Sequence, residues 1–221
     1  MKASTDVSGP QKLTSKGQAT RGRILEQAAE LIYVNGVHAT NNEMLRQAAD
    51  VSGSQLAHYF PNKESLVVAV IDWQADSVLG FHRDERFTGF DSIEAFQDWA
   101  DFYVLSGRAF DDGCSLGSLA SEIVKTDLDV HDELTRVFEQ WRDIFLEGLE
   151  RMQHRGRLTK AADPERLANM ILAAYQGGML LAQIARDITP LRDSLYTAID
   201  YLRTFANALE GSDASERAPK S

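Results

Sequence analysis

The sequence has little cysteine and no cluster of metal-binding residues. Cys114 is the only cysteine among 221 residues, so no disulfide can form within the chain and a reducing cytoplasm is the expected compartment. The five histidines, at positions 38, 58, 82, 131 and 154, form no HxxxH pair. Zinc sites need closely spaced ligands of this kind. We therefore expect no metal and no other cofactor.

Long hydrophobic runs are also lacking. No basic start followed by about 7–15 apolar residues marks a secretion signal. Residues 168–185 are largely apolar, but Asn169, Gln176 and Gln183 recur there at helical spacing. A packed interface helix explains this segment better than a membrane span, so we expect no membrane partner.

Positive charge is scarce and unevenly distributed. Lysine and arginine number 23 against 33 aspartates and glutamates, a net charge of −10. The first 60 residues hold six basic and five acidic residues, a net charge of +1, so the remainder carries −11. Five of the six cations lie at or before Arg23. Because an acidic body repels nucleic acid, any contact with it is expected in the N-terminal part.

Apolar residues follow helical spacing throughout, and no segment shows strand alternation, so the expected fold is all-α. A first helix is predicted from about residue 17 to Asn35-Gly36. Thr40-Asn41-Asn42, Ser52 and Asn62 can cap three further helices, the first two ending near Ala49 and His58. Later helices are predicted at 93–108, 115–125, 132–154, 164–187 and 191–209.

This pattern predicts a three-helix, helix-turn-helix head followed by a helical body. The turn between the second and third helices has three residues, which would let the third helix lie in the major groove of DNA. The predicted parts are a disordered basic arm (1–16), a DNA-binding head (17–62), a helical body (63–210) and a disordered tail (211–221).

Residues 20–70 resemble the TetR family of transcriptional regulators. They read TRGRILEQAAELIYVNGVHATNNEMLRQAADVSGSQLAHYFPNKESLVVAV, of which HYFPNKESL is the most specific part. The resemblance implies a non-enzymatic regulator, expected to be a repressor, that binds a palindromic operator as a homodimer. A small-molecule effector in the body would shift the fourth helix and release the DNA.

The resemblance also implies residue roles in the head. Gln55 would read adenine in the major groove, and the Thr40 hydroxyl would hold a phosphate at the start of the second helix. A basic arm of Lys12, Lys16, Arg21 and Arg23 would reach a neighbouring groove. The predicted DNA-binding residues are Lys16, Arg21, Thr40, Asn42, Ser52, Gly53, Ser54, Gln55, His58, Tyr59 and Lys63.

Three residues of the head depart from the family pattern. Asp50 stands where glycine is usual, Gly53 where a long side chain is common, and Ala57 where an aromatic residue is usual. Asp can adopt the left-handed backbone conformation that such a turn needs. The other two changes remove contacts, which leaves open a ligand- or partner-binding helical protein without DNA recognition. An enzyme with a Cys114–His dyad is a further, disfavoured alternative.

For the body, residues 63–210, the resemblance implies ligand binding and dimerisation. Aromatic residues at helical spacing could line an apolar cavity, although most such residues are core. Cys114 could be a sensor, but a buried small apolar side chain is the favoured interpretation. The predicted pocket residues are Trp99, Tyr103, Phe110, Cys114, Glu122, Trp141, Phe145, Tyr175 and Gln176. The predicted dimer residues, on the last two helices, are Met170, Ala174, Gly178, Leu181, Ala185, Leu195, Ile199 and Leu202.

Overall fold

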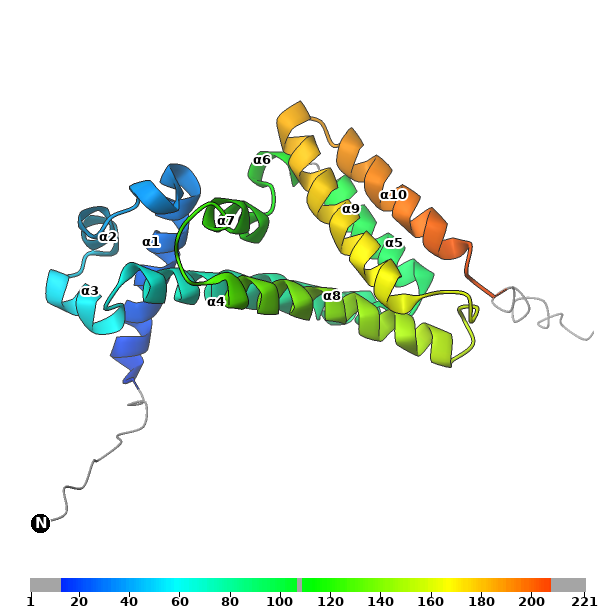
Figure 1. The fold of residues 1–221 in the computed structure, drawn as a ribbon, viewed down its shortest axis with the longest axis horizontal. Coiled ribbons are helices and arrows are strands. Elements are labelled where there is room, and N and C mark those ends of the chain that lie inside the picture. Colours follow the sequence, from blue (N-terminus) through cyan, green and yellow to red (C-terminus); the bar gives the residue numbers. More distant parts are fainter. Residues whose placement is uncertain (1–12, 107–108, 208–221) are drawn as a thin grey trace, which may run out of the picture. The chain divides into compact units, whose positions relative to one another are not determined.

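The computed structural model describes residues 13–106 and 109–207, which form helices and no strand (Figure 1). The predicted all-α fold is confirmed. The chain divides into two compact units, residues 1–70 and 71–221, which we call the head and the body. Helix α4 (Lys63–His82) begins in the head and ends in the body. Most of the predicted arm and the whole predicted tail lie outside the described residues.

The first helix, α1 (Ser15–Ala39), begins earlier than predicted. The Thr14 hydroxyl accepts a hydrogen bond from the Gly17 amide at 3.2 Å, which caps the helix. Lys16 therefore belongs to the first helical turn and not to an arm. The backbone leaves the helical conformation at Gly36, with φ of 81°, as the Asn35-Gly36 signal predicted, and a short helical segment follows to Ala39.

The two short helices of the head are α2 (Asn42–Ala49) and α3 (Gly53–Tyr59). The Asn41 side chain caps α2 by accepting from two backbone amides, and Ser52 caps α3. The turn between them has three residues, as predicted. Its first residue, Asp50, has φ of 48° and ψ of 59°, so aspartate does adopt the left-handed conformation here.

Among its described residues, the body holds one short 3-10 helix, η1, and six further α-helices. Helix α9 packs against α8 and α10, while α5 packs against α10 and η1. Neither η1 nor α6 was predicted from the sequence. The bounds are η1 (Glu85–Phe90), α5 (Ile93–Leu105), α6 (Ala109–Asp112), α7 (Ser115–Ile123), α8 (His131–His154), α9 (Pro164–Ala185) and α10 (Thr189–Arg203).

Helix α10 ends six residues before the predicted Leu209. The chain after it turns back on the loop that follows α8, where Thr159 donates its amide to the Phe205 carbonyl at 2.8 Å. Asn207 likewise donates its amide to the Arg157 carbonyl at 2.9 Å. These long-range bonds replace the helical ones, and they cannot be read from local periodicity.

Helix α9 is the one described helix that is long and apolar enough to cross a membrane by length and composition. It nevertheless packs closely inside the body. A Cβ atom on Gly178 would lie 3.0 Å from the Leu191 Cα of α10 and would clash with the Ser194 hydroxyl. Glycine therefore lets α9 and α10 approach each other within the chain.

The centre of the body is a cluster of aromatic rings around His82. The His82 ring lies 4.9 Å from the Trp141 ring and 5.9 Å from the Trp99 ring, between centroids. Phe145 and Tyr175 complete this cluster, which joins α4, α5, α8 and α9. Burial lowers the pKa of His82 to about 4, despite its hydrogen bond with the Val78 carbonyl.

We expect Gly148→Ala to destabilise the body by about 1–3 kcal/mol. Gly148 of α8 is buried against η1, where a Cβ atom would lie 2.7 Å from the Gly89 carbonyl oxygen and clash with that of Phe90. Gly80→Ala in α4 is the matched control, because no atom lies within 4 Å of its Cβ position. It should stabilise by about 0.5–1 kcal/mol. Urea denaturation measures the free energy of unfolding of both variants. Equal changes in the two would contradict the close packing of Gly148 against η1.

His82 should also make stability depend on pH. The unfolded chain takes up a proton near pH 6.5, but the folded chain does so only near pH 4. Stability therefore falls as the pH drops between these values, by about 3 kcal/mol at pH 4 relative to pH 7. The His82→Phe variant lacks this titrating group. Between pH 7 and pH 4 its stability should therefore fall by about 3 kcal/mol less than that of the wild type. Parallel pH dependences of the two proteins would refute this assignment.

Candidate nucleic-acid interface and body pockets

Helix α3 presents three of the predicted DNA-reading residues to solvent. Ser54, Gln55 and His58 are all exposed on this helix. Gln55 also has a structural role that was not predicted: its side-chain oxygen accepts the Ser52 amide at 2.9 Å, while the Ser52 hydroxyl accepts the Gln55 amide at 3.1 Å. This reciprocal capping box stabilises the start of α3. The Gln55 amide nitrogen is the group left to donate elsewhere.

The first turn of α3 has room for a larger side chain. Ser52 is exposed, and its hydroxyl is 3.0 Å from that of Ser54. A Cβ atom on Gly53 would have only the Arg46 side chain nearby, at 3.7 Å or more. Glycine is therefore not required here by packing.

The predicted phosphate-binding residues differ in their availability. Thr40 is 4% exposed and its hydroxyl donates to the Gly36 carbonyl at 2.9 Å, so its proton is already used. The Lys63 ammonium donates to the His38 and Thr40 carbonyls, both at 3.3 Å. Exposed Asn42 begins α2. Thr40, Asn42 and Lys63 share the lining of a groove of about 320 Å³.

Two cations assigned to the arm stabilise the head instead. The Arg21 guanidinium lies over the Phe60 ring, 5.4 Å from its centroid, and the Arg23 Nε donates to the Ala49 carbonyl at 2.8 Å. Lys16 is exposed. The Tyr59 hydroxyl lies against α1, 3.4 Å from where a Cβ on Gly17 would be. Both arginines thus belong to α1, and Arg23 satisfies a carbonyl at the C-terminal end of α2.

The predicted aromatic pocket residues are mostly core. Trp99, Trp141 and Phe145 are fully buried and Tyr175 is 4% exposed. Their shared neighbour His82 was missed from the sequence, where the only signal is one histidine in an apolar helix. A cleft of about 390 Å³ between α4, η1 and α8 includes His82 in its wall.

Cys114 and Gln176 line a different pocket, of about 280 Å³, between α7 and α9. The Cys114 sulfur accepts the Gly117 amide at 3.2 Å and contacts Gln176 Nε2 at 3.6 Å. Burial raises the pKa of the thiol, which disfavours a reactive thiolate.

A third pocket, of about 400 Å³, lies between α7, α8 and α9. Tyr103 packs against Tyr175, while neither Phe110 nor Glu122 lines these three pockets.

Half of the predicted dimer residues are buried within the chain. Leu195, Ile199 and Leu202 of α10 are at most 1% exposed, and Gly178 faces α10. They pack α10 against its own chain and cannot contact a partner in this conformation. Leu181 and Ala185 are exposed, and Met170 and Ala174 are partly exposed.

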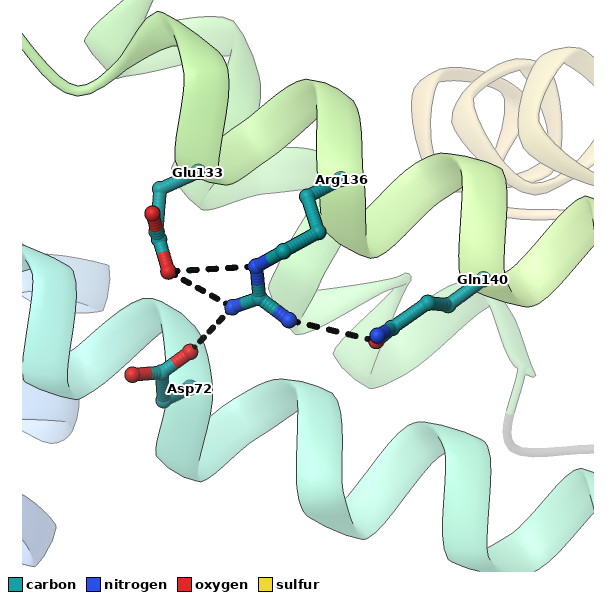
Figure 2. Close-up of polar contacts among 4 residues, drawn as sticks. All are labelled: Asp72, Glu133, Arg136 and Gln140. Carbon is teal, nitrogen blue, oxygen red and sulfur yellow. Dashed lines mark hydrogen bonds and ion pairs between the residues drawn. The ribbon is translucent and has the colours of Figure 1, made fainter.

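A polar cluster holds α4 against α8 inside the body (Figure 2). One Arg136 guanidinium nitrogen donates to Asp72 of α4 at 2.6 Å and to Glu133 at 2.7 Å. A second nitrogen donates to Gln140 at 3.3 Å. Asp72 is the second residue of α4 beyond the boundary between head and body. The cluster therefore fixes α4 close to where it enters the body.

Comparisons with known proteins agree with this architecture. Residues 24–70 match the model of bacterial regulatory proteins of the tetR family. Residues 92–195 match the model of the C-terminal domain of LmrA/YxaF-like transcriptional regulators.

Two curated relatives are similar over most of their length. The HTH-type regulator YxaF of Bacillus subtilis (strain 168) is 28% identical over 186 residues, which cover 81% of this chain and 92% of YxaF. The HTH-type transcriptional repressor DhaR of Mycobacterium sp. (strain GP1) is 23% identical, over 82% of this chain and 91% of DhaR.

Solved structures share the fold. A TetR regulator from Chloroflexus aurantiacus superposes with a TM-score of 0.71 at 25% identity, over 87% of this chain and 98% of its own. The reduced form of Escherichia coli NemR superposes with a TM-score of 0.72 at 20% identity, over 81% of this chain and 95% of its own. Since both matched family models describe TetR regulators and the full-length relatives agree, the chain belongs to the TetR family of transcriptional regulators.

Proposed function

We propose that this regulator is a cytoplasmic repressor that binds a palindromic operator as a homodimer and is released by a small molecule. The observation that carries the proposal is α3, a capped helix after a three-residue turn with Ser54, Gln55 and His58 exposed. A helix placed in this way enters the major groove and presents such side chains to base edges. No catalytic step is part of the proposal.

Gln55 would read an adenine through its side-chain amide. A glutamine pairs with adenine by donating to N7 and accepting from N6. The Gln55 nitrogen is available for the first bond, and the second requires its oxygen to leave the Ser52 amide. His58, exposed on the same helix, would contact a neighbouring base edge.

Phosphate contacts would come from Lys16, Asn42, Tyr59 and Lys63. Lys63 already donates two hydrogen bonds, but its ammonium group has three protons. The groove that it shares with Asn42 lies beside the start of α2, where the helix dipole favours an anion.

We expect Gln55→Glu to weaken operator binding by at least about tenfold while the head stays folded. Glutamate at this position still accepts the Ser52 amide in the capping box, but it cannot donate to adenine and it repels phosphate. Fluorescence anisotropy with an operator selected from a random DNA pool measures the affinity.

Asn169→Asp in α9 is the control for that variant, because it adds the same charge to the body. It should bind operator as the wild type does, and both variants should melt as the wild type does. Unchanged affinity of Gln55→Glu would exclude Gln55 from base reading. Failure of the wild type to select any DNA would favour a ligand-binding protein without DNA recognition, the alternative that Gly53 and Ala57 suggest.

The homodimer would form through the exposed face of α9. Leu180, Leu181 and Ile184 are 58%, 54% and 71% exposed, and exposed Gly177 has no atom within 4 Å of its Cβ position. These residues form one apolar stripe, which we call the α9 stripe. Large exposed apolar side chains in a row mark an interface, and a twofold axis would pair the stripe with itself.

We expect Leu181→Glu to convert the dimer to a monomer and to lower operator affinity strongly. A carboxylate in the centre of a self-paired stripe meets its own copy in an apolar interface, where burying unpaired charge is costly. Leu105→Glu in α5 is the matched control, since Leu105 is 78% exposed and lies outside the stripe. Sedimentation velocity distinguishes the two, and a dimeric Leu181→Glu protein would rule out this interface.

Effector release would act through α4. This one helix belongs to both head and body, and in the body it is held by the Arg136 cluster and by the rings around His82. A ligand that binds better when α4 is shifted would favour that state, and the separation of the two recognition helices would no longer fit the operator.

A further inference from the structure

Positive charge is scarce around the recognition helix, where Arg46 is the only lysine or arginine between Arg23 and Lys63. This stretch includes all of α2, the turn and α3. The two cations that flank it already bond to backbone carbonyls of the head. Since DNA binding depends on cationic side chains, the place of the Arg46 guanidinium decides what else this part of the head can contact.

The backbone of Arg46 is tied to the turn that leads to α3. The Arg46 carbonyl accepts the amides of Asp50 and Val51, the latter at 3.1 Å. Such bonds close the C-terminal end of a helix and fix the path of the chain after it. The base of the Arg46 side chain therefore has a defined position relative to α3.

The Arg46 side chain lies beside the first residue of α3. A Cβ atom on Gly53 would lie 3.7 Å from Arg46 Nε and 3.8 Å from Arg46 Cδ. A long side chain at position 53, which is common in the family, would cover this part of the helix. Glycine leaves this surface to the guanidinium of Arg46.

Most of the donors of Arg46 are available. Its guanidinium makes one hydrogen bond among the described residues, from Nη1 to Glu43 Oε2 at 2.9 Å, and arginine has five N–H donors. The two side chains are 43% and 61% exposed. Because exposed ion pairs contribute little to stability, the guanidinium can turn toward DNA at low cost.

The carboxylate beside Arg46 favours an uncharged partner over a phosphate. Glu43 is held in place by Gln47, which donates to its other oxygen at 2.8 Å, and its negative charge would repel a phosphate close to the pair. The major-groove edge of guanine is uncharged, and its O6 and N7 atoms accept two N–H groups of one arginine. Residues at the start of a recognition helix are the ones that meet base edges.

We propose that Arg46 reads a guanine in each half-site of the operator, in place of a long side chain at position 53. This inference names a residue that determines operator sequence, and so it rests on the proposed function. It assigns base reading to α2 as well as to α3.

Operators that lack single acceptor atoms test the contact. The full-length wild type first selects an operator from a random DNA pool. Each guanine is then replaced, in both half-sites, by 7-deazaguanine, which still pairs with cytosine but lacks the N7 acceptor. We expect one position at which the replacement lowers wild-type affinity by about tenfold or more, and at which Arg46→Ala is affected by less than about twofold.

Two further variants separate base reading from charge. Glu43→Gln keeps Arg46 and should keep the sensitivity to 7-deazaguanine. The double variant Glu43→Gln/Arg46→Ala has the net charge of the wild type, so it should bind random-sequence DNA equally well and still lose the sensitivity. Thermal melting identifies a variant that fails to fold. Arg46→Lys, which keeps the charge but lacks the planar fork, then replaces Arg46→Ala and should be less sensitive than the wild type.

The possible outcomes distinguish this inference from the proposed function. If the wild type selects an operator but no guanine is sensitive, or the sensitivity is the same without Arg46, base reading by Arg46 is refuted and the proposed function stands. An Arg46→Ala protein that loses affinity equally for all DNA while keeping the sensitivity would assign Arg46 to a phosphate, which also refutes the inference. If the wild type selects no operator, both fail.

Discussion

The burial of His82 among aromatic rings is the contact on which the arrangement of the body depends. Rings from α4, α5, α8 and α9 meet at this one side chain. Protein interiors are packed closely enough that one helix cannot move without its neighbours. A displacement of α4 in the body must therefore rearrange α5 and α8 as well. A switch through α4 would therefore require a second discrete packing of this core rather than a gradual deformation.

The Arg136 cluster restrains the same helix in a different way. Its ion pair with Asp72 is half exposed, with side-chain exposures of 43% and 49%, and such pairs contribute little to stability. The Arg136 cluster instead defines the position of α4, since one guanidinium bonds α4 and two residues of α8 at the same time. The rings supply most of the energy that holds α4, and the polar cluster supplies a defined position that can be exchanged at low cost.

The sequence predicted local features well and long-range ones poorly. The caps at Asn41 and Ser52 and the left-handed Asp50 depend on neighbouring residues, and the structure has all three. Apolar periodicity also identified the helices, but it shows only that a face is buried, not what covers it. For this reason Leu195 and Ile199 were assigned to a partner, although they are buried within this chain, where α10 packs against α9 and α5. The burial of His82 among aromatic rings was invisible for the same reason, since its neighbours come from distant helices.

The free head already satisfies groups that DNA would need. The Gln55 oxygen, the Thr40 hydroxyl and the Lys63 ammonium all have partners within the head. Binding exchanges these hydrogen bonds for others, so each contact gains less than it would from an unpaired group. With Gly53 and Ala57 adding no phosphate contact, we expect one head to bind weakly. In the proposed dimer two joined heads would overcome this, because the second would bind at a high effective concentration, provided that the spacing fits. A small change in spacing would then cost much of the affinity, so weak heads would make the proposed dimer responsive to a ligand.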